Sequence, residues 1–119
     1  MSRGPVPSRL CHFPSLPECG LGEKVRFLGC VTSYSTASAS LELGYRGSAV
    51  VVVVDVKLVL RALGEELTRV GEWVNVIGYV VGVDGASARV QALMVWSTGP
   101  LDLGRYEGSF EGAAFSDGG

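Results

Sequence analysis

The spacing of apolar residues changes once along the chain, and this change limits the fold more than any other feature. Five segments alternate apolar and polar residues or are continuously β-branched, which is typical of strands: residues 24–34, 40–46, 49–54, 73–83 and 88–97. Between the third and fourth segments, apolar residues recur at a spacing of three and four: Val56, Val59, Leu60, Leu63 and Leu67. This spacing predicts a helix, with Asp55 as its N-cap and Gly71 as its end.

Three strands, a helix and two strands are the plan of the OB-fold, a five-stranded Greek-key barrel. We therefore expect an all-β fold with one helix between strands 3 and 4 and a short C-terminal helix. An SH3-like barrel is the alternative, but such barrels generally lack a full helix at this position. Gly29 lies in the middle of the first strand, where a glycine allows a long strand to curl and pair with two neighbours.

The 119 residues suffice for one domain, and composition divides them into three parts. Residues 1–22 hold four of the five prolines and are expected to form an extended N-terminal arm. Residues 23–112 would contain the OB-fold domain with its C-terminal helix. Residues 113–119 carry no recognisable feature and are expected to be a disordered tail.

Composition and charge restrict the class of protein. A chain that is 47% hydrophobic and 18% charged is too apolar to be disordered. The formal net charge of −2 argues against a strong, autonomous nucleic-acid binder. The longest apolar run, residues 49–54, is far shorter than a membrane span requires. An odd cysteine count and the lack of an apolar signal segment predict a domain that works inside the cell and off the membrane.

The inventory of reactive residues does not favour an enzyme. The sequence has no phosphate-binding glycine loop and no nucleophile-elbow motif. Its one histidine, His12, lies between Cys11 and Cys19, but a structural zinc site needs four ligands at a different spacing. We therefore expect no catalytic residues, no metal and no cofactor. A small enzyme or ligand-binding barrel remains as a third alternative, and it would require a pocket with convergent polar groups.

Three stretches carry a resemblance to a known family: GEKVRFLGCVTSY (residues 22–34), RVGEWVNVIGYV (69–80) and VQALMVWSTGPLDLGRYE (90–107). In their order and spacing they resemble the small OB-fold (Ten) subunit of the CST telomere-capping complex, of the filamentous-fungal type. The likeness covers about residues 5–107. The smallest subunit of replication protein A is a looser relative with the same plan.

The resemblance implies a non-catalytic nuclear protein at the telomeric region of chromosomes. It implies a heterodimer with a larger OB-fold (Stn) subunit, and a third large CST subunit in the complete complex. Such a complex protects single-stranded telomeric DNA and supports lagging-strand fill-in by DNA polymerase alpha–primase. The partner contact would be made by the side of the barrel and the C-terminal helix.

Six residues are the candidates for this partner interface: Arg26, Trp96, Leu101, Leu103, Tyr106 and Phe110. The last four would form the apolar face of a glycine-broken helix, and aromatic anchors are common at interface centres. Alternatively, these four residues cover the open end of their own barrel. Arg26 is charged on an otherwise apolar strand, so it would pair across the interface, lie on the DNA side or simply be solvated.

Four residues are the candidates for nucleic-acid contact: Tyr34, Tyr45, Arg46 and Arg89. OB-folds bind single strands with stacked aromatic rings and a basic groove, and this set is small for that purpose. Trp73 and Trp96 could also stack on bases, although strand tryptophans are more often packed in the protein. We therefore expect weak DNA contact that depends on the partner. The alternative function is an autonomous single-stranded nucleic-acid-binding OB-fold protein.

Overall fold

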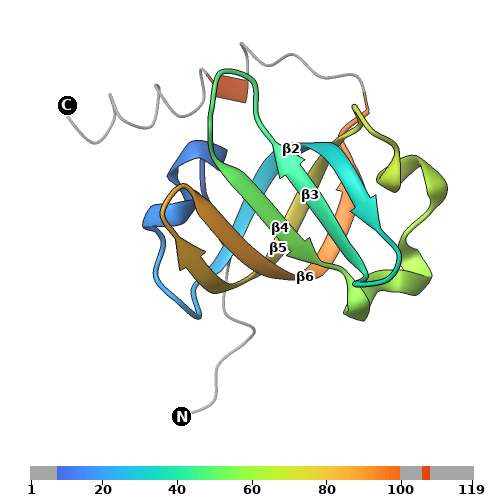
Figure 1. Ribbon diagram of the computed structural model, residues 1–119, viewed down its shortest axis with the longest axis horizontal. Coiled ribbons are helices and arrows are strands. Elements are labelled where there is room, and N and C mark those ends of the chain that lie inside the picture. The colour runs from blue at the N-terminus through green and yellow to red at the C-terminus, as the bar shows by residue number, and fades with distance from the viewer. Residues whose placement is uncertain (1–7, 100–105, 108–119) are drawn as a thin grey trace.

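A computed structural model describes residues 8–99 and 106–107, and its strands close into a barrel (Figure 1). Six strands lie in these residues: β1 (Arg9–Leu10), β2 (Lys24–Ser35), β3 (Ser40–Gly44), β4 (Val51–Asp55), β5 (Trp73–Asp84) and β6 (Ser87–Ser97). Three 3-10 helices accompany them: η1 (Phe13–Glu18), η2 (Lys57–Ala62) and η3 (Glu65–Thr68). The strand order is β1-β2-β3-β4-β6-β5, and a further pairing between β2 and β5 closes the sheet.

The pairing confirms the predicted OB-fold. The first half of β2 runs antiparallel to β5, and its second half runs antiparallel to β3. The partner changes at Cys30, which pairs with both Gly44 and Trp73. β4 and β6 are parallel, as the barrel requires. The long first strand therefore pairs with two neighbours, as its central glycine predicts.

The alternation of each strand divides its side chains between the barrel interior and the outer surface. In β5, every second residue from Val74 to Val80 is buried, and the residues between them are half-buried. The same period holds in β6 from Ala88 to Ala92. A period of two therefore predicted the core positions of these strands correctly, because each side chain alternates between faces whatever the strand pairs with.

The structure corrects the prediction of one helix between strands 3 and 4. Two short 3-10 helices, η2 and η3, take its place. Val56 and Leu67 are buried and fix the two ends of this connection, whereas Leu60 is 46% exposed. The apolar spacing therefore does not form one continuous buried stripe. The N-cap position of η2 is Val56 and not the predicted Asp55, although Asp55 Oδ1 accepts a hydrogen bond from the Lys57 amide at 2.9 Å.

The N-terminal region also differs from the extended arm that its prolines predict. Its described part forms β1, parallel to β2, and then η1, which contacts β2, β5 and β6. Phe13 and Leu16 of η1 are fully buried in the barrel core. Gly29 makes room for this packing, because a Cβ there would lie 3.0 Å from the Phe13 ring and 3.2 Å from Leu43.

Of the predicted C-terminal helix, Tyr106 and Glu107 are the described residues, and their backbone is α-helical. The rest of that prediction, and the predicted tail at 113–119, lie outside the described residues. Within residues 8–99 and 106–107, no helix has the length and apolar character needed to cross a membrane.

Candidate partner and nucleic-acid interfaces

The first candidate surface is the outer face of β2, β5 and β6. Strand register places two rows of side chains across it. One row joins Arg26, Ile77 and Met94, and the next joins Leu28, Asn75 and Trp96. These six residues are the ones meant by the outer face from here on. Leu10 of β1 pairs with Arg26 and extends the first row.

Burial differs sharply between the two rows. Leu28 shares the outward parity of Arg26 and does not belong to the barrel core, yet it is only 1% exposed. In the other row, Met94 is 55% exposed and Arg26 is also exposed. The outer face is therefore covered at Leu28 and open at Met94. The open row joins the exposed Leu10 and Met94 to the half-buried Ile77, with Arg26 among them, and exposed apolar patches rimmed by polar groups mark contacts with other chains.

The C-terminal segment reaches the barrel next to this face. Tyr106 packs against the barrel core, and burial raises the pKa of its phenol to about 12. A hydrogen bond to the Leu28 backbone and, less strongly, the Arg26 charge act on this pKa in the opposite direction, so the Tyr106 hydroxyl lies beside Leu28. Figure 1 shows the helical turn of Tyr106 and Glu107 beside the loop that joins β3 and β4.

Glu107 holds this turn through Tyr45. The Tyr45 hydroxyl donates a hydrogen bond to Glu107 Oε2 at 2.7 Å. The Tyr45 ring is stacked on Phe13 at 5.7 Å and meets His12 and Trp73 edge-on at 5.1 and 5.6 Å. Burial, and then the bond to Glu107, raise the pKa of Tyr45. Because Phe13 belongs to η1, this cluster connects the N-terminal segment to the C-terminal one.

The structure therefore places three of the six predicted interface residues, Arg26, Trp96 and Tyr106, on or beside the outer face. The predicted residues Leu101, Leu103 and Phe110 lie outside the described residues. Leu28, Ile77 and Met94 complete the outer face and were not among the predicted residues. The parity of Leu28 with Arg26 was visible in the sequence, but the register that brings Ile77 and Met94 beside them was not.

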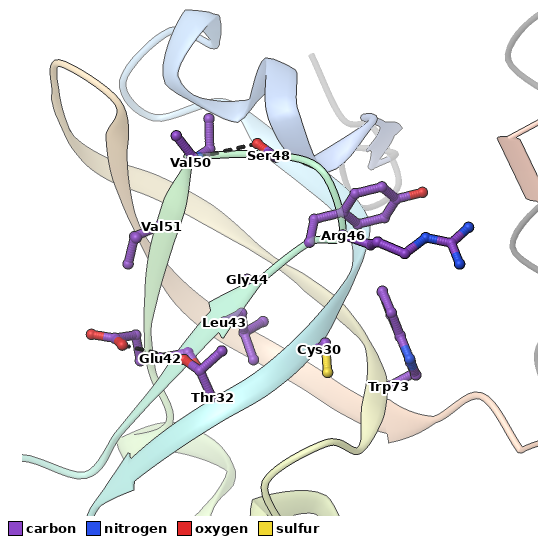
Figure 2. A pocket seen from close by; sticks show the side chains of 12 residues that line it. Cys30, Thr32, Glu42, Leu43, Gly44, Arg46, Ser48, Val50, Val51 and Trp73 are labelled. Carbon is purple, nitrogen blue, oxygen red and sulfur yellow. Dashed lines mark hydrogen bonds between the residues drawn. The ribbon is translucent and has the colours of Figure 1, made fainter.

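A second candidate surface is a groove of about 450 Å³ over β2, β3 and the loop that follows β3 (Figure 2). Figure 2 shows Arg46 and Trp73 near one end of this groove and Glu42 and Thr32 near the other. The Thr32 hydroxyl donates a hydrogen bond to the Glu42 carboxylate at 3.2 Å. The groove thus offers a guanidinium and an indole, with one carboxylate opposing them.

A neighbouring hollow of about 370 Å³ lies further along β3 and β4. Lys57 and Arg89 line it together with Asp55, Ser38 and Ser40. Groove and hollow use successive outward residues of β4, so they lie on one side of the barrel. OB-folds bind oligonucleotides over the second and third strands of the barrel, which are β3 and β4 in this chain. Three cations against two carboxylates make this side only weakly basic.

The predicted nucleic-acid residues are distributed unevenly over this side. Arg46 and Arg89 are exposed, in the groove and the hollow respectively. Tyr34 is half-buried and packs against the core. The structure corrects the prediction that Tyr45 contacts nucleic acid. Its side chain is only 6% exposed. His12, Phe13 and Trp73 surround the ring, so neither face is open to a base. Trp73 packs against the core, as expected, and its half-buried side chain also lines the groove.

Cys11, His12 and Cys19 do not form a metal site in the part of the chain that the structure describes. Among the described residues, no three His, Cys, Asp or Glu side chains gather in an arrangement that could hold a metal ion.

Comparison with known proteins decides the family. A family model described as "Telomere capping, CST complex subunit", that of Ten1, matches residues 1–111. The chain belongs to the Ten1 family. It is therefore a telomere-capping OB-fold subunit of the CST type. No curated protein matches the chain by sequence.

Solved structures agree with this assignment. A Stn1–Ten1 complex from S. pombe matches at 30% identity and a TM-score of 0.75, over 93% of this chain and 95% of that one. The telomere capping protein Ten1 from S. pombe matches at 30% identity and a TM-score of 0.74, over 91% and 98% of the two chains. Replication protein A of U. maydis, bound to single-stranded DNA, matches at 22% identity and a TM-score of 0.64, over 93% and 94%. At that identity the likeness shows a shared fold.

Proposed function

We propose that this Ten1-family chain forms a heterodimer with a larger OB-fold subunit of the Stn type, through the outer face and the C-terminal segment. One observation carries the proposal: Leu28 is buried outside the barrel core, while Met94 in the adjacent row is 55% exposed. In the monomer, the exposed Met94 side chain contributes no burial energy, and a partner chain that covers it would supply this energy. The S. pombe relative was solved as a Stn1–Ten1 complex, which supports the same arrangement here.

The residues of the outer face have separate roles in this proposal. Ile77 and Met94 supply apolar area, and Trp96 supplies an aromatic anchor of the kind that dominates interface energies. Arg26 lies beside them and would pair with an acidic or carbonyl group of the partner at the edge of the contact. Because Tyr106 is already seated at Leu28, the C-terminal segment would form part of the surface that the partner meets.

The experiment is to co-express the full chain with the larger OB-fold subunit from the same organism and measure the dissociation constant by calorimetry. Met94→Glu, which places a charge in the apolar contact, is expected to weaken binding at least about tenfold. Val81→Glu is the matched control, since Val81 is 54% exposed and lines the hollow with Arg89 instead. Equal affinity of both variants and the wild type would exclude the outer face as the interface.

Together with this partner and a third large subunit, we propose that the chain protects single-stranded telomeric DNA and supports fill-in by DNA polymerase alpha–primase. This role is non-catalytic and places the protein in the nucleus at telomeres. The groove and hollow provide three cations against two carboxylates. That balance supports a small DNA contribution by this chain, made within the complex.

An autonomous single-stranded nucleic-acid binder is the second candidate function. The position of Arg46 and Arg89 on the oligonucleotide-binding side of the fold favours it. It requires micromolar or tighter binding by the chain alone. The heterodimer proposal requires stoichiometric co-purification of the larger subunit. A native pull-down of the tagged chain from its own cells, followed by mass spectrometry, separates the two.

A further inference from the structure

Two buried cysteines bracket η1 and lie side by side. Cys11 precedes this helix and Cys19 follows it, and their sulfur atoms are 3.5 Å apart. They are only 4% and 6% exposed. The backbone fixes both positions, because the Cys11 amide donates to the Arg26 carbonyl at 2.8 Å and the Cys19 amide donates to the Leu16 carbonyl at 3.0 Å. Two thiols held in this way are placed to form a disulfide when an oxidant removes two electrons.

We propose that Cys11 and Cys19 are an oxidation site, at which hydrogen peroxide converts the two thiols into an intramolecular disulfide that ties the ends of η1 together. The proposal is independent of the partner interface. A disulfide bond is about 2.05 Å long, so the sulfur atoms need to approach by roughly 1.5 Å. Small rotations of the two side chains can supply such a movement without displacing the helix between them.

The two thiols take different roles in this oxidation. Burial raises the pKa of the Cys19 thiol to about 12, which keeps it protonated. Cys11 is therefore the residue that attacks the oxidant, and Cys19 resolves the product.

The oxidation takes two steps. The Cys11 thiolate attacks one oxygen of hydrogen peroxide, the O–O bond breaks, and Cys11 sulfenic acid forms while hydroxide leaves and takes a proton to become water. The Cys19 sulfur then attacks the Cys11 sulfur, the S–O bond breaks, and hydroxide leaves with the Cys19 proton as a second water. The two thiols lose two electrons in total, and peroxide gains them.

The consequence of the bond would be a more stable barrel. η1 carries Phe13 and Leu16, both fully buried in the core. A disulfide across η1 removes freedom from the unfolded chain and keeps these residues close to their binding position. For a loop of this length, we expect the thermal midpoint of the full chain to rise by roughly 5–10 °C on oxidation.

Peptide mapping of the wild-type full chain tests the proposal directly. Trypsin releases residues 10–24 as one peptide, which contains Cys11 and Cys19 but not Cys30. After treatment with peroxide and alkylation, we expect this peptide to lack two hydrogens and both alkyl groups, and a reductant should restore both. Cys11→Ser and Cys19→Ser should each abolish the rise in thermal midpoint. Cys30→Ser, which removes the third thiol, should retain it.

Three results would overturn the proposal. They are full alkylation of peptide 10–24 after peroxide, sulfinic acid at Cys11 without a cross-link, and a disulfide that uses Cys30 in place of either residue. Since the mapping uses the wild-type chain, it does not depend on whether the serine variants fold.

Discussion

At the scale of single residues, two glycines of β5 show how differently the same residue can be used. A Cβ on Gly78 would meet the Gln91 carbonyl oxygen and, at 2.8 Å, the Val90 side chain. A Cβ on Gly82 would lie 3.5 Å from the Arg89 side chain, an ordinary contact. Gly78 faces the barrel interior next to a register shift between β5 and β6. The strands can approach this closely only because Gly78 has no side chain.

The first prediction is that Gly78→Ala destabilises the chain by about 2–3 kcal/mol, because β5 and β6 must separate to admit a methyl group. Gly82→Ala is the matched variant and is expected to change the free energy of unfolding by less than about 0.5 kcal/mol. Urea denaturation of the full chains measures both values. Equal effects of the two substitutions would mean that the close approach at Gly78 has no energetic weight.

The second prediction concerns alkaline pH. The pKa of Tyr106 is raised by burial from its ordinary value of 10.0 to about 12, and that of Cys19 from 9.0 to about 12. Each group therefore stays protonated in the folded chain at a pH where it ionises in the unfolded chain. By linkage, their contribution to stability is complete below about pH 9 and is lost as the pH rises towards 12.

Denaturation midpoints measured from pH 8 to 11.5 check this prediction. Tyr106→Phe should reduce the loss of stability above about pH 10, because phenylalanine has no proton to release. Tyr79→Phe is the control on β5, away from the C-terminal segment, and should leave the loss unchanged. A wild-type chain of constant stability across this range would contradict the assigned burial of Tyr106 and Cys19.

At the scale of elements, η1 is the segment whose importance the sequence concealed. Its prolines suggested an arm outside the domain, but the helix contacts β2, β5 and β6 and fills the barrel core. Through the stacking of Phe13 on Tyr45, it also supports the residue that holds Glu107. The N-terminal segment is therefore structurally part of the barrel and of the C-terminal attachment.

The third prediction is that Leu16→Ala costs about 2–4 kcal/mol of stability, as expected for a fully buried leucine. Leu21→Ala is the matched variant, since Leu21 is 72% exposed and its truncation is expected to cost less than about 0.5 kcal/mol. Thermal or urea denaturation distinguishes the two. A small effect of Leu16→Ala would restore the interpretation of this segment as an arm.

At the scale of the whole molecule, the two candidate interfaces use different residues of the barrel. The outer face lies on β2, β5 and β6; the groove lies over the second half of β2, β3 and the loop after β3, and the hollow is lined by residues of β3, β4, β5 and β6. The groove begins at Cys30 and Trp73, next to Leu28 and Asn75 of the outer face. Because the net charge of the chain is −2, DNA binding would depend on a local cluster of basic side chains. The groove and hollow together contain three such side chains.

The fourth prediction is that the chain alone binds single-stranded DNA weakly, with a Kd of about 10–100 μM at physiological salt. Three phosphate contacts give a slope of log K against log salt of about −2, because each contact contributes about −0.7. Arg46→Gln with Arg89→Gln should reduce the slope to about −0.7. Arg61→Gln with Arg69→Gln removes the same charge outside the groove and hollow and should not. Fluorescence anisotropy across a salt series measures all three.

The sequence alone determined the strands and the fold class, because the alternation of side chains within a strand is a local property that needs no knowledge of the partner strand. It also predicted Arg26, Trp96 and Tyr106 as interface residues, which stays a prediction. Tertiary structure decided what depends on pairing and packing: the register that joins Ile77 and Met94 to Arg26, and the burial of Tyr45, Cys11 and Cys19. It also decided that the residues after Asp55 form two 3-10 helices, since Val56 and Leu67 are fixed by contacts with residues distant in sequence.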